Sequence, residues 1–211
     1  MPQPNPKYTA DPNEVPLQLT TPPVRDVVTA LRASWPGLGE QGGRTMTAQF
    51  VLETGWGKHC FNWNIGNMKP KTAQQTYAFR PSVWECYGPS DASSYVANGH
   101  GLVHLATADE IKQHEACTAP KVMVIFLAPH DQCRFLAFAS LLGGAQALVE
   151  RHKKVISFDP NYLSELNAAD IPNVVSALNK SGYFTSNVGQ YTASMISVKA
   201  RIDKQLGPPK P

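Results

Sequence analysis

The sequence predicts an α+β protein that is mostly helical and carries a small antiparallel β-ribbon. Five stretches combine a helical pattern with capping or stop signals, whereas strand-like runs occur only at Thr76–Tyr87 and Lys121–Leu127. Of the 211 residues, 42% are hydrophobic and 17% are charged, which suits a chain with a buried core. The polar segment 88–120 between the two runs is too long for a hairpin turn, so we expect an inserted loop there.

Two helices are expected before the first strand. The first covers about 23–35, where apolar residues recur at helical spacing until the Pro36-Gly37 pair stops it. The second covers about 43–54 and ends at Gly55 and Gly57. A loop dense in Asn, Trp and Gly follows over 60–71.

Three further helices are expected after the second strand. Ser140 is a suitable N-cap for a helix that ends near Lys154. Asp170, with Pro172 in the first turn, begins a helix that ends at Asn179, before Ser181-Gly182. The last helix is amphipathic, and its apolar stripe consists of Tyr191, Met195, Val198, Ile202 and Leu206.

These elements predict one domain over 23–206. Residues 1–22 hold six of the eighteen prolines, so we expect an extended and poorly packed arm. The Pro-rich tail 207–211 is expected to fray. Residues 1–23 contain no basic region followed by an apolar run, so the chain is expected to leave its cell without a Sec signal, unless one was removed earlier.

The overall charge excludes some kinds of partner. Nineteen basic and sixteen acidic residues leave a net charge of +3, too little to predict a nucleic-acid-binding protein but compatible with an anionic polymer as substrate. No apolar run approaches the roughly 18 residues that a membrane span requires, so no membrane partner is expected.

The four cysteines, at positions 60, 86, 117 and 133, allow two disulfides in three connectivities, or four reduced thiols. No pair has the CxxC spacing of a zinc knuckle or a thioredoxin motif. If disulfides form, we favour Cys86–Cys117 together with Cys60–Cys133.

Glu53 is the first candidate for chemistry. On a helix it follows Met46 and Phe50 along one apolar stripe, so its carboxyl is expected to be partly desolvated. Desolvation and the negative end of the helix dipole both favour the protonated carboxyl and raise its pKa, as a general acid near neutral pH requires. The alternatives are a solvated Glu53, or one paired with Lys58 or Arg44.

Two adjacent stretches, Glu53–Lys58 (ETGWGK) and Asn62–Lys69 (NWNIGNMK), resemble the signature of glucosaminidases of glycoside hydrolase family 73. Two later stretches agree in order, namely Cys133–Leu141 and Gly182–Thr185, the latter with Tyr191 after it. Together the matches cover about residues 40–205. The resemblance implies a lysozyme-like fold and cleavage of the β-1,4 bond after N-acetylglucosamine in peptidoglycan.

The same resemblance implies roles for individual residues. Glu53 becomes the general acid that protonates the glycosidic oxygen, and Tyr183 closes the site and positions the acetamido group or a water. Trp56, Trp63 and Asn64 suit the sugar face, because aromatic rings stack on pyranose C–H surfaces and an amide both donates and accepts. The alternatives are an ordinary half-buried Tyr183 and a Trp56 that belongs to the core.

The family's second carboxylate is expected on the ribbon, and Glu85 is our choice. Glu85 would either activate water directly or support attack by the substrate's own acetamido group. The alternative is a solvent-facing strand glutamate, with Asp91 and Asp109 as reserve candidates.

Segment 88–120 departs from the family because it is longer than the usual ribbon connection. Its His100 and His104 would share a helix face, but the adjacent Gly99 and Gly101 argue against a metal site. A lid or specificity loop is the better expectation. The inferred chemistry requires no cofactor and no metal.

Alternatives remain at the level of function. A muramidase or lytic transglycosylase on the same fold would break the other glycosidic bond, and a non-catalytic glycan-binding module would carry a poorly placed acid. The circumstances suit an interbacterial toxin of the type VI secretion kind that acts in a target's periplasm; a phage endolysin is the alternative. A toxin predicts a cognate immunity protein that occludes the cleft, and disulfides that form after delivery.

Overall fold

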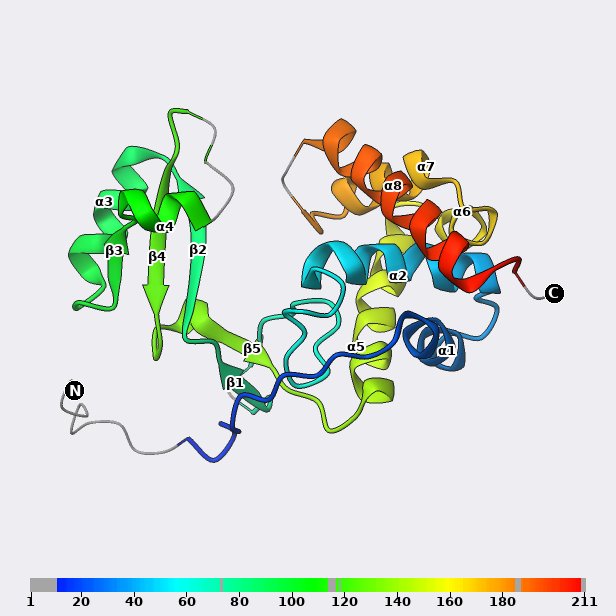
Figure 1. Ribbon diagram of the computed structural model, residues 1–211, viewed down its shortest axis with the longest axis horizontal. Helices are drawn as coiled ribbons and strands as arrows, with labels where there is room; N and C mark the ends of the chain where they lie inside the picture. Colours follow the sequence, from blue (N-terminus) through cyan, green and yellow to red (C-terminus); the bar gives the residue numbers. More distant parts are fainter. Residues whose placement is uncertain (1–10, 73, 114–116, 118, 185–186, 210–211) are drawn as a thin grey trace. The chain divides into compact units, whose positions relative to one another are not determined.

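The structure is a computed structural model that describes residues 11–72, 74–113, 117, 119–184 and 187–209. It divides into two compact units. We call Gln18–Met68 with Ala137–Pro211 the helical unit, and the chain up to Leu17 with Lys69–Leu136 the β unit. The predicted α+β class, mostly helical with a small antiparallel β part, is confirmed (Figure 1).

The helical unit is built around one central helix. Its α-helices are α1 (Val24–Ser34), α2 (Glu40–Thr54), α5 (Leu141–Lys153), α6 (Tyr162–Ala168), α7 (Ile171–Lys180) and α8 (Val188–Leu206). Helix α2 contacts α1, α6 and α8, and α1 also packs against α5. The fully buried side chains at these contacts are Leu31, Met46, Phe50, Leu148, Leu166, Leu178 and Ile202.

Local signals position these helices as the sequence predicts. The Ser140 side chain accepts a hydrogen bond from Gly143 N at 3.2 Å, and Asp170 accepts one from Asn173 N at 3.4 Å. Helix α2 begins three residues earlier than expected because Glu40, in its first turn, forms an ion pair with Arg44 one turn later. Helix α6 is not among the predicted elements.

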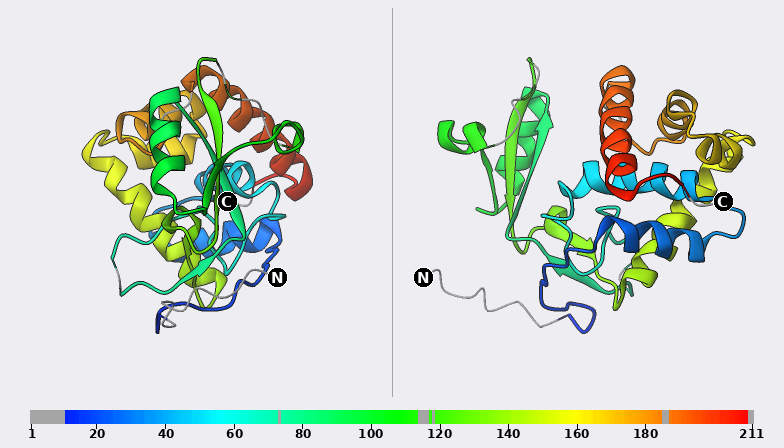
Figure 2. Two further views of the ribbon diagram at one scale, coloured as in Figure 1. Left: turned by 90° about the vertical axis from the view of Figure 1, so that its left-hand side faces the viewer. Right: turned by 45° about the vertical axis from the view of Figure 1, so that its right-hand side comes forward.

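The β unit contains two small antiparallel sheets. Strand β1 (Tyr77–Phe79) pairs with β5 (Arg134–Leu136), while β2 (Ser82–Tyr87), β4 (Val122–Leu127) and β3 (Val103–Leu105) pair in the order β2–β4–β3. Helix α3 (Pro89–Asn98) lies against β3 and β4 (Figures 1 and 2). The buried core of this unit consists of Ala92, Val103, Val124, Phe126 and Cys133.

Segment 88–120 is therefore not the inserted loop that the sequence suggests. Its described residues form α3, β3 and the short helix α4 (Ala108–Gln113). The correction has a physical reason: Ala92 and Val103 each supply one buried side chain, too few to produce a visible period, yet both pack against β4. In place of the expected single ribbon of two strands, the described chain forms two sheets, one of two strands and one of three.

Parts of the described arm and tail form hydrogen bonds with the rest of the chain. Val15 N donates to Tyr77 O at 2.9 Å in the β unit, and the buried Thr20 hydroxyl donates to Cys60 O at 3.2 Å in the helical unit. At the other end, the buried Arg44 guanidinium donates to Gly207 O and Pro208 O at 2.7 and 3.4 Å. Residues 1–10 and 210–211 lie outside the described chain.

One predicted disulfide is confirmed and the other is wrong. Cys86 and Cys117 are bonded, with their Cα atoms 5.7 Å apart. Cys60 and Cys133 form no disulfide, because each thiol is buried within its own unit. Cys133 Sγ donates to Phe126 O at 3.3 Å, and burial raises the pKa of that thiol.

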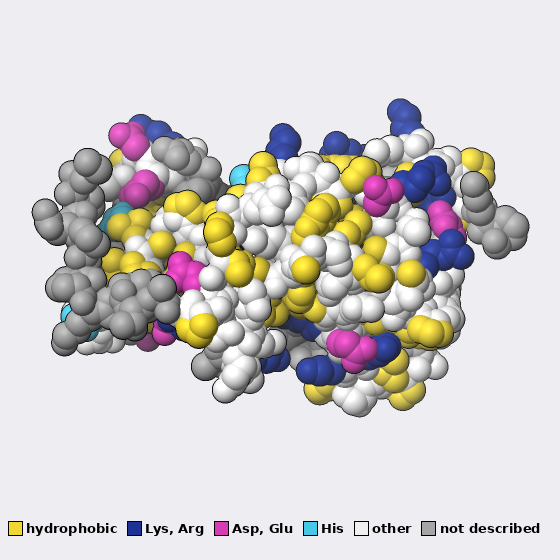
Figure 3. Space-filling model, turned by 90° about the horizontal axis from the view of Figure 1, so that it is seen from below, with side chains coloured by type: hydrophobic (Ala, Val, Ile, Leu, Met, Phe, Trp, Pro, Cys, Tyr) yellow, Lys and Arg dark blue, Asp and Glu magenta, His cyan; other side chains and the backbone are white. Residues whose placement is uncertain are grey.

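Charges are mixed on the surface. On the face drawn in Figure 3, basic and acidic side chains lie close to one another among polar and hydrophobic ones, in keeping with the net charge of +3. Across the described chain, every helix is too short or too polar to span a bilayer.

Candidate active site

Glu53 lies in the last turn of α2 and is partly buried. Met46 and Phe50, on the same face of the helix, are fully buried, so the carboxyl stands at the end of an apolar stripe as predicted. Arg44 is not its partner, since that guanidinium pairs with Glu40 and Asp203 at 3.0 and 3.1 Å. The Asn67 side chain donates a hydrogen bond to Glu53 O and so attaches the following loop to this turn.

The helix ends in three successive left-handed residues. Gly55, Trp56 and Gly57 have φ angles of 56°, 63° and 81°, and for a bulky residue such as Trp56 that conformation is strained. The Thr54 hydroxyl secures the turn by donating to Phe50 O at 2.7 Å and accepting from Gly57 N at 3.0 Å. The motif after Glu53 is thus a rigid helix stop that leaves the carboxyl in the final turn.

The Asn-rich loop is closed by Asn64. Its amide is buried, donates to Met68 O at 2.8 Å and accepts from Met68 N at 2.8 Å. Because Asn64 is 1% exposed and both polar groups of its amide bond to Met68, the amide is not open to a sugar in this structure, and substrate binding by Asn64 stays a prediction. Half-buried Trp63 is held through its backbone: its N–H donates to Thr20 Oγ1 at 3.0 Å, and a Cβ added at Gly144 would lie 1.9 Å from its carbonyl oxygen.

Two tyrosines lie beside Glu53. Tyr183 follows α7 and Tyr191 stands in the first turn of α8; both hydroxyl oxygens are buried, and neither has a hydrogen-bond partner among the residues that the structure describes. Burial raises the pKa of both phenols well above the usual range, and the negative charge of Glu53 raises both further. Packing therefore brings Glu53 and Tyr183 together as predicted, along with Tyr191.

Gln49 completes this group. It stands one turn before Glu53, its side chain is 1% exposed, and neither polar atom of its amide has a hydrogen-bond partner in the described part of the chain. The amide lies near enough to the Tyr191 hydroxyl to moderate its pKa, although not in hydrogen-bond geometry. We call Gln49, Glu53, Tyr183 and Tyr191 the Glu53 cluster.

The Glu53 cluster is unusual for a protein interior. Buried polar groups are nearly always hydrogen-bonded, so buried polar atoms without partners indicate either a cost in stability or a functional site. Here four such atoms, in three side chains, surround one carboxylate. Gln49 is not among the predicted site residues, although a polar residue one turn before Glu53 on an apolar stripe was a usable signal.

A second layer of side chains packs against Tyr183. The Arg151 guanidinium lies over its ring at 3.8 Å, and the His152 ring meets it edge-on at 5.6 Å. His152 Nδ1 lies 2.7 Å from the Tyr162 hydroxyl, and burial lowers the pKa of His152 to about 3, so its imidazole is neutral at pH 7. No sequence pattern pointed to these residues, because α5 and α6 bring them together only in three dimensions.

Trp56 is neither fully buried in the core nor fully exposed to a ligand. It is half-buried, and the Arg201 guanidinium from α8 lies 4.4 Å from the centroid of its indole ring. One face of the ring is thus covered by a cation. Sugar stacking stays a prediction that concerns the opposite face.

The remaining candidates lie in the β unit. Glu85 is exposed on β2 and its carboxylate is 3.6 Å from Lys69 Nζ, an environment typical of a solvent-facing strand glutamate. Asp91 is exposed in the first turn of α3, and the exposed Asp109 pairs with Lys112. A catalytic role for any of them stays a prediction.

His104 does not share a helix with His100. It lies in β3, and its ring is 3.1 Å from the Glu110 carboxylate. A search of the described residues finds no group of three side chains suited to hold a metal ion. Thr185, the last residue of the Gly182–Thr185 stretch, lies outside the described chain.

Comparisons of the chain with protein-family models, with curated proteins and with solved structures found no match. The functional assignment therefore rests on the residues themselves and on the geometry of the Glu53 cluster.

Proposed function

We propose that the chain is a peptidoglycan hydrolase that cleaves the β-1,4 bond between N-acetylglucosamine and N-acetylmuramic acid, with Glu53 as general acid. The observation that best supports this function is the Glu53 cluster, in which a partly buried carboxyl lies beside four buried polar atoms of Gln49, Tyr183 and Tyr191 that have no hydrogen-bond partner among the described residues. An ordinary structural glutamate does not need such surroundings, whereas a site that stabilises charge along a reaction does.

The proposed chemistry gives one role to each of two groups in the cluster. A glycosidic oxygen must be protonated as the sugar becomes oxocarbenium-like, and the Glu53 carboxyl is the proton donor. The raised pKa of Tyr183 keeps its hydroxyl neutral at physiological pH, so it is able to donate a hydrogen bond. In our proposal that hydroxyl positions the acetamido group of the substrate or the attacking water.

The deciding experiment is digestion of purified peptidoglycan by the wild type and by Glu53→Gln, followed by borohydride reduction and mass spectrometry. We expect reduced N-acetylglucosamine ends from the wild type and almost none from Glu53→Gln. Glu150→Gln is the matched control, because Glu150 is an exposed glutamate of the same unit that forms an ion pair with Lys153.

Other products would replace the proposal with a named alternative. Reduced muramic ends would indicate a muramidase, and anhydro-muramic ends a lytic transglycosylase. Full activity of Glu53→Gln would refute the role of Glu53, and no cleavage by the folded wild type would favour a glycan-binding module.

The same assay on Glu85→Gln separates two mechanisms. A loss of about a hundredfold or more would support direct activation of water by Glu85, since a positioned general base contributes on the order of 100-fold to 10,000-fold. A mild effect would favour attack by the substrate's own acetamido group.

We further propose that the protein acts as an interbacterial toxin in the periplasm of a target cell. The Cys86–Cys117 disulfide supports an oxidising site of action. Expression directed to the periplasm should then lyse cells, expression retained in the cytoplasm should not, and Glu53→Gln should be harmless in both. A cognate immunity protein should protect cells only when it too is periplasmic.

A further inference from the structure

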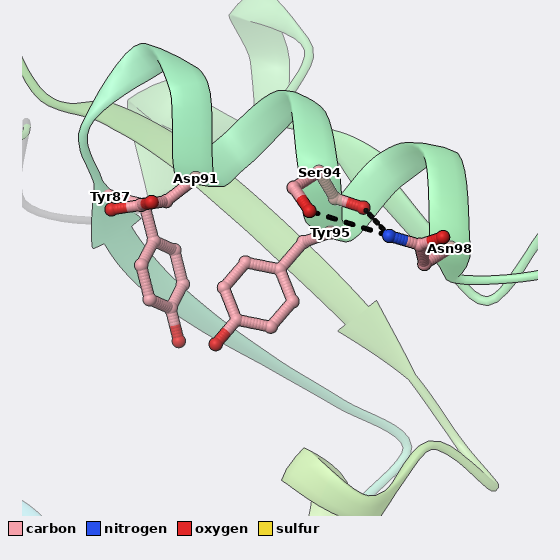
Figure 4. Close-up of a pocket in the computed structure, with 5 residues that line it drawn as sticks. All are labelled: Tyr87, Asp91, Ser94, Tyr95 and Asn98. Carbon is pink, nitrogen blue, oxygen red and sulfur yellow. Dashed lines mark hydrogen bonds between the residues drawn. The ribbon is translucent and has the colours of Figure 1, made fainter.

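A pocket lies in the β unit, where β2 leads into α3. It has a volume of about 420 Å³, and its described lining residues are Tyr87, Asp91, Ser94, Tyr95 and Asn98 (Figure 4). Four of them recur at helical spacing along one face of α3, and Tyr87 is the last residue of β2. The segment that supplies this helix is the one that departs from the family 73 pattern.

The two tyrosines give the pocket a fixed aromatic wall. Their ring centroids are 4.6 Å apart, and both rings meet Phe126 edge-on, at 6.1 Å from Tyr87 and 5.4 Å from Tyr95. Phe126 is fully buried in the core of the unit, so the ring pair is anchored before any ligand arrives. In Figure 4 both hydroxyls point the same way, away from the α3 backbone.

The polar groups of the pocket are mixed in kind. Asp91 offers a carboxylate that only accepts hydrogen bonds, whereas the tyrosine and serine hydroxyls both donate and accept. Burial raises the pKa of Tyr87 well above the usual range, so its hydroxyl stays neutral. Asn98 Nδ2 donates to Ser94 O and Ser94 Oγ at 2.9 and 3.3 Å, which orients these two side chains along the rim (Figure 4).

The charges around the pocket favour a neutral ligand. None of the described lining residues is a lysine or arginine, and Asp91 and nearby Glu85 place negative charge around the ring of Tyr87. A phosphate or carboxylate ligand would be repelled. Asp91 is exposed and Glu85 is already paired with Lys69, so the described lining does not offer a cation a desolvated carboxylate.

We infer that this pocket is a carbohydrate-binding site that holds one or two neutral sugar units against Tyr87 and Tyr95. Ring surfaces and groups that both donate and accept match the two properties of a pyranose, its C–H faces and its hydroxyls. The inference goes beyond the proposed cleavage and does not require Glu53, because the pocket belongs wholly to the β unit. For a peptidoglycan hydrolase, such a site would retain the glycan strand independently of cleavage.

The test is titration of the isotope-labelled full chain, carrying Glu53→Gln to prevent turnover, with the N-acetylglucosamine tetramer, followed by NMR of the backbone amides. We expect the amides of residues 87–98 to shift. Asp91→Asn and Tyr95→Phe should each weaken this response about tenfold, since the first replaces a charged acceptor oxygen with an amide NH2 group and the second removes a hydroxyl. Ser93→Ala, on α3 but outside the described lining, should leave it unchanged.

Three results would overturn the inference, provided the spectrum shows a folded chain. They are no shift in residues 87–98, shifts of full strength in both Asp91→Asn and Tyr95→Phe, and a response to free lysine that the neutral sugar does not produce. Failure of the proposed function is distinguishable, because it appears as uncleaved peptidoglycan in the wild type whether or not these amides shift.

Discussion

Gln49 is the residue whose surroundings are hardest to explain by stability alone. Its amide is buried and has no hydrogen-bond partner among the described residues, and a buried amide left unpaired costs about 1–3 kcal/mol relative to a satisfied one. The adjacent Tyr183 and Tyr191 hydroxyls carry the same cost. Buried polar groups that lower the stability of the fold and lie beside a candidate acid are expected to support its chemistry.

Gln49→Met is therefore expected to separate stability from activity. Methionine keeps the length of the side chain and removes both unpartnered atoms, so the free energy of unfolding should stay equal or rise by about 1–3 kcal/mol. Peptidoglycan cleavage should fall by about tenfold or more, because Gln49 lies one turn from Glu53 and helps to position the cluster. The measurements are chemical denaturation and the amount of soluble product released from peptidoglycan, both on the same preparation. A destabilised variant with normal activity would show that Gln49 is purely structural.

His152 is expected to make stability depend on pH. Burial lowers the folded-state pKa of His152 from 6.5 to about 3, so between these values the unfolded chain binds a proton that the folded chain does not. The contribution is fully present above pH 6.5 and is lost as the pH falls towards 3, at up to about 1.4 kcal/mol per pH unit.

The measurement is urea unfolding of the wild type and of His152→Asn at several pH values in this window. The variant should be less stable at pH 7 but should lose less stability as the pH falls. His59→Asn, which replaces an exposed histidine of the same unit, should keep the wild-type slope. Equal slopes for wild type and His152→Asn would mean that His152 titrates normally in the folded chain.

At the scale of elements, the Cys86–Cys117 disulfide ties the end of β2 to the residues after α4. The cysteines are 31 residues apart, and a crosslink of that length stabilises by about 3–4 kcal/mol in the chain-entropy model. The segment between them forms α3, β3 and α4, whose few buried side chains make a small core.

Reduction should consequently destabilise the β unit selectively. Hydrogen exchange followed by mass spectrometry should show lost amide protection in β2, α3 and β4 of the reduced chain, and little change in α1, α2 and α5. Uniform loss of protection in both units would contradict this expectation, as would unchanged exchange in the β unit.

At the scale of the whole molecule, each of the two units has its own hydrophobic core, and each closes through segments that are distant in the sequence. The helical unit joins residues 18–68 to residues 137–211, and the β unit joins residues near Tyr77 to the N-terminal segment through the Val15–Tyr77 hydrogen bond. In the helical unit, the buried Arg44 links α2 to α8 and to the tail carbonyls.

Much of the helical unit was predictable because its signals are local. The Ser140 and Asp170 caps and the glycine stop after Thr54 act within a few residues, so a single sequence displays them. The placement of Glu53 at the end of an apolar stripe follows from helical period alone. The strands β3 and β5 could not be predicted from the sequence, because three residues are too few to show an alternating hydrophobic pattern.

The grouping of Glu53 with Tyr183 and Tyr191 depends on contacts between distant parts of the chain and not on local signals. More than a hundred residues separate them, and only the packing of α8 against α2 and α7 places the two tyrosines beside the carboxylate and buries their hydroxyls. The same holds for the thiols of Cys60 and Cys133. The number of cysteines suggests that these two form a disulfide, but in the folded chain each thiol is buried in a different unit. Periodicity and capping depend on neighbours along the chain, whereas burial and electrostatic environment depend on neighbours in space, and only the folded chain defines those.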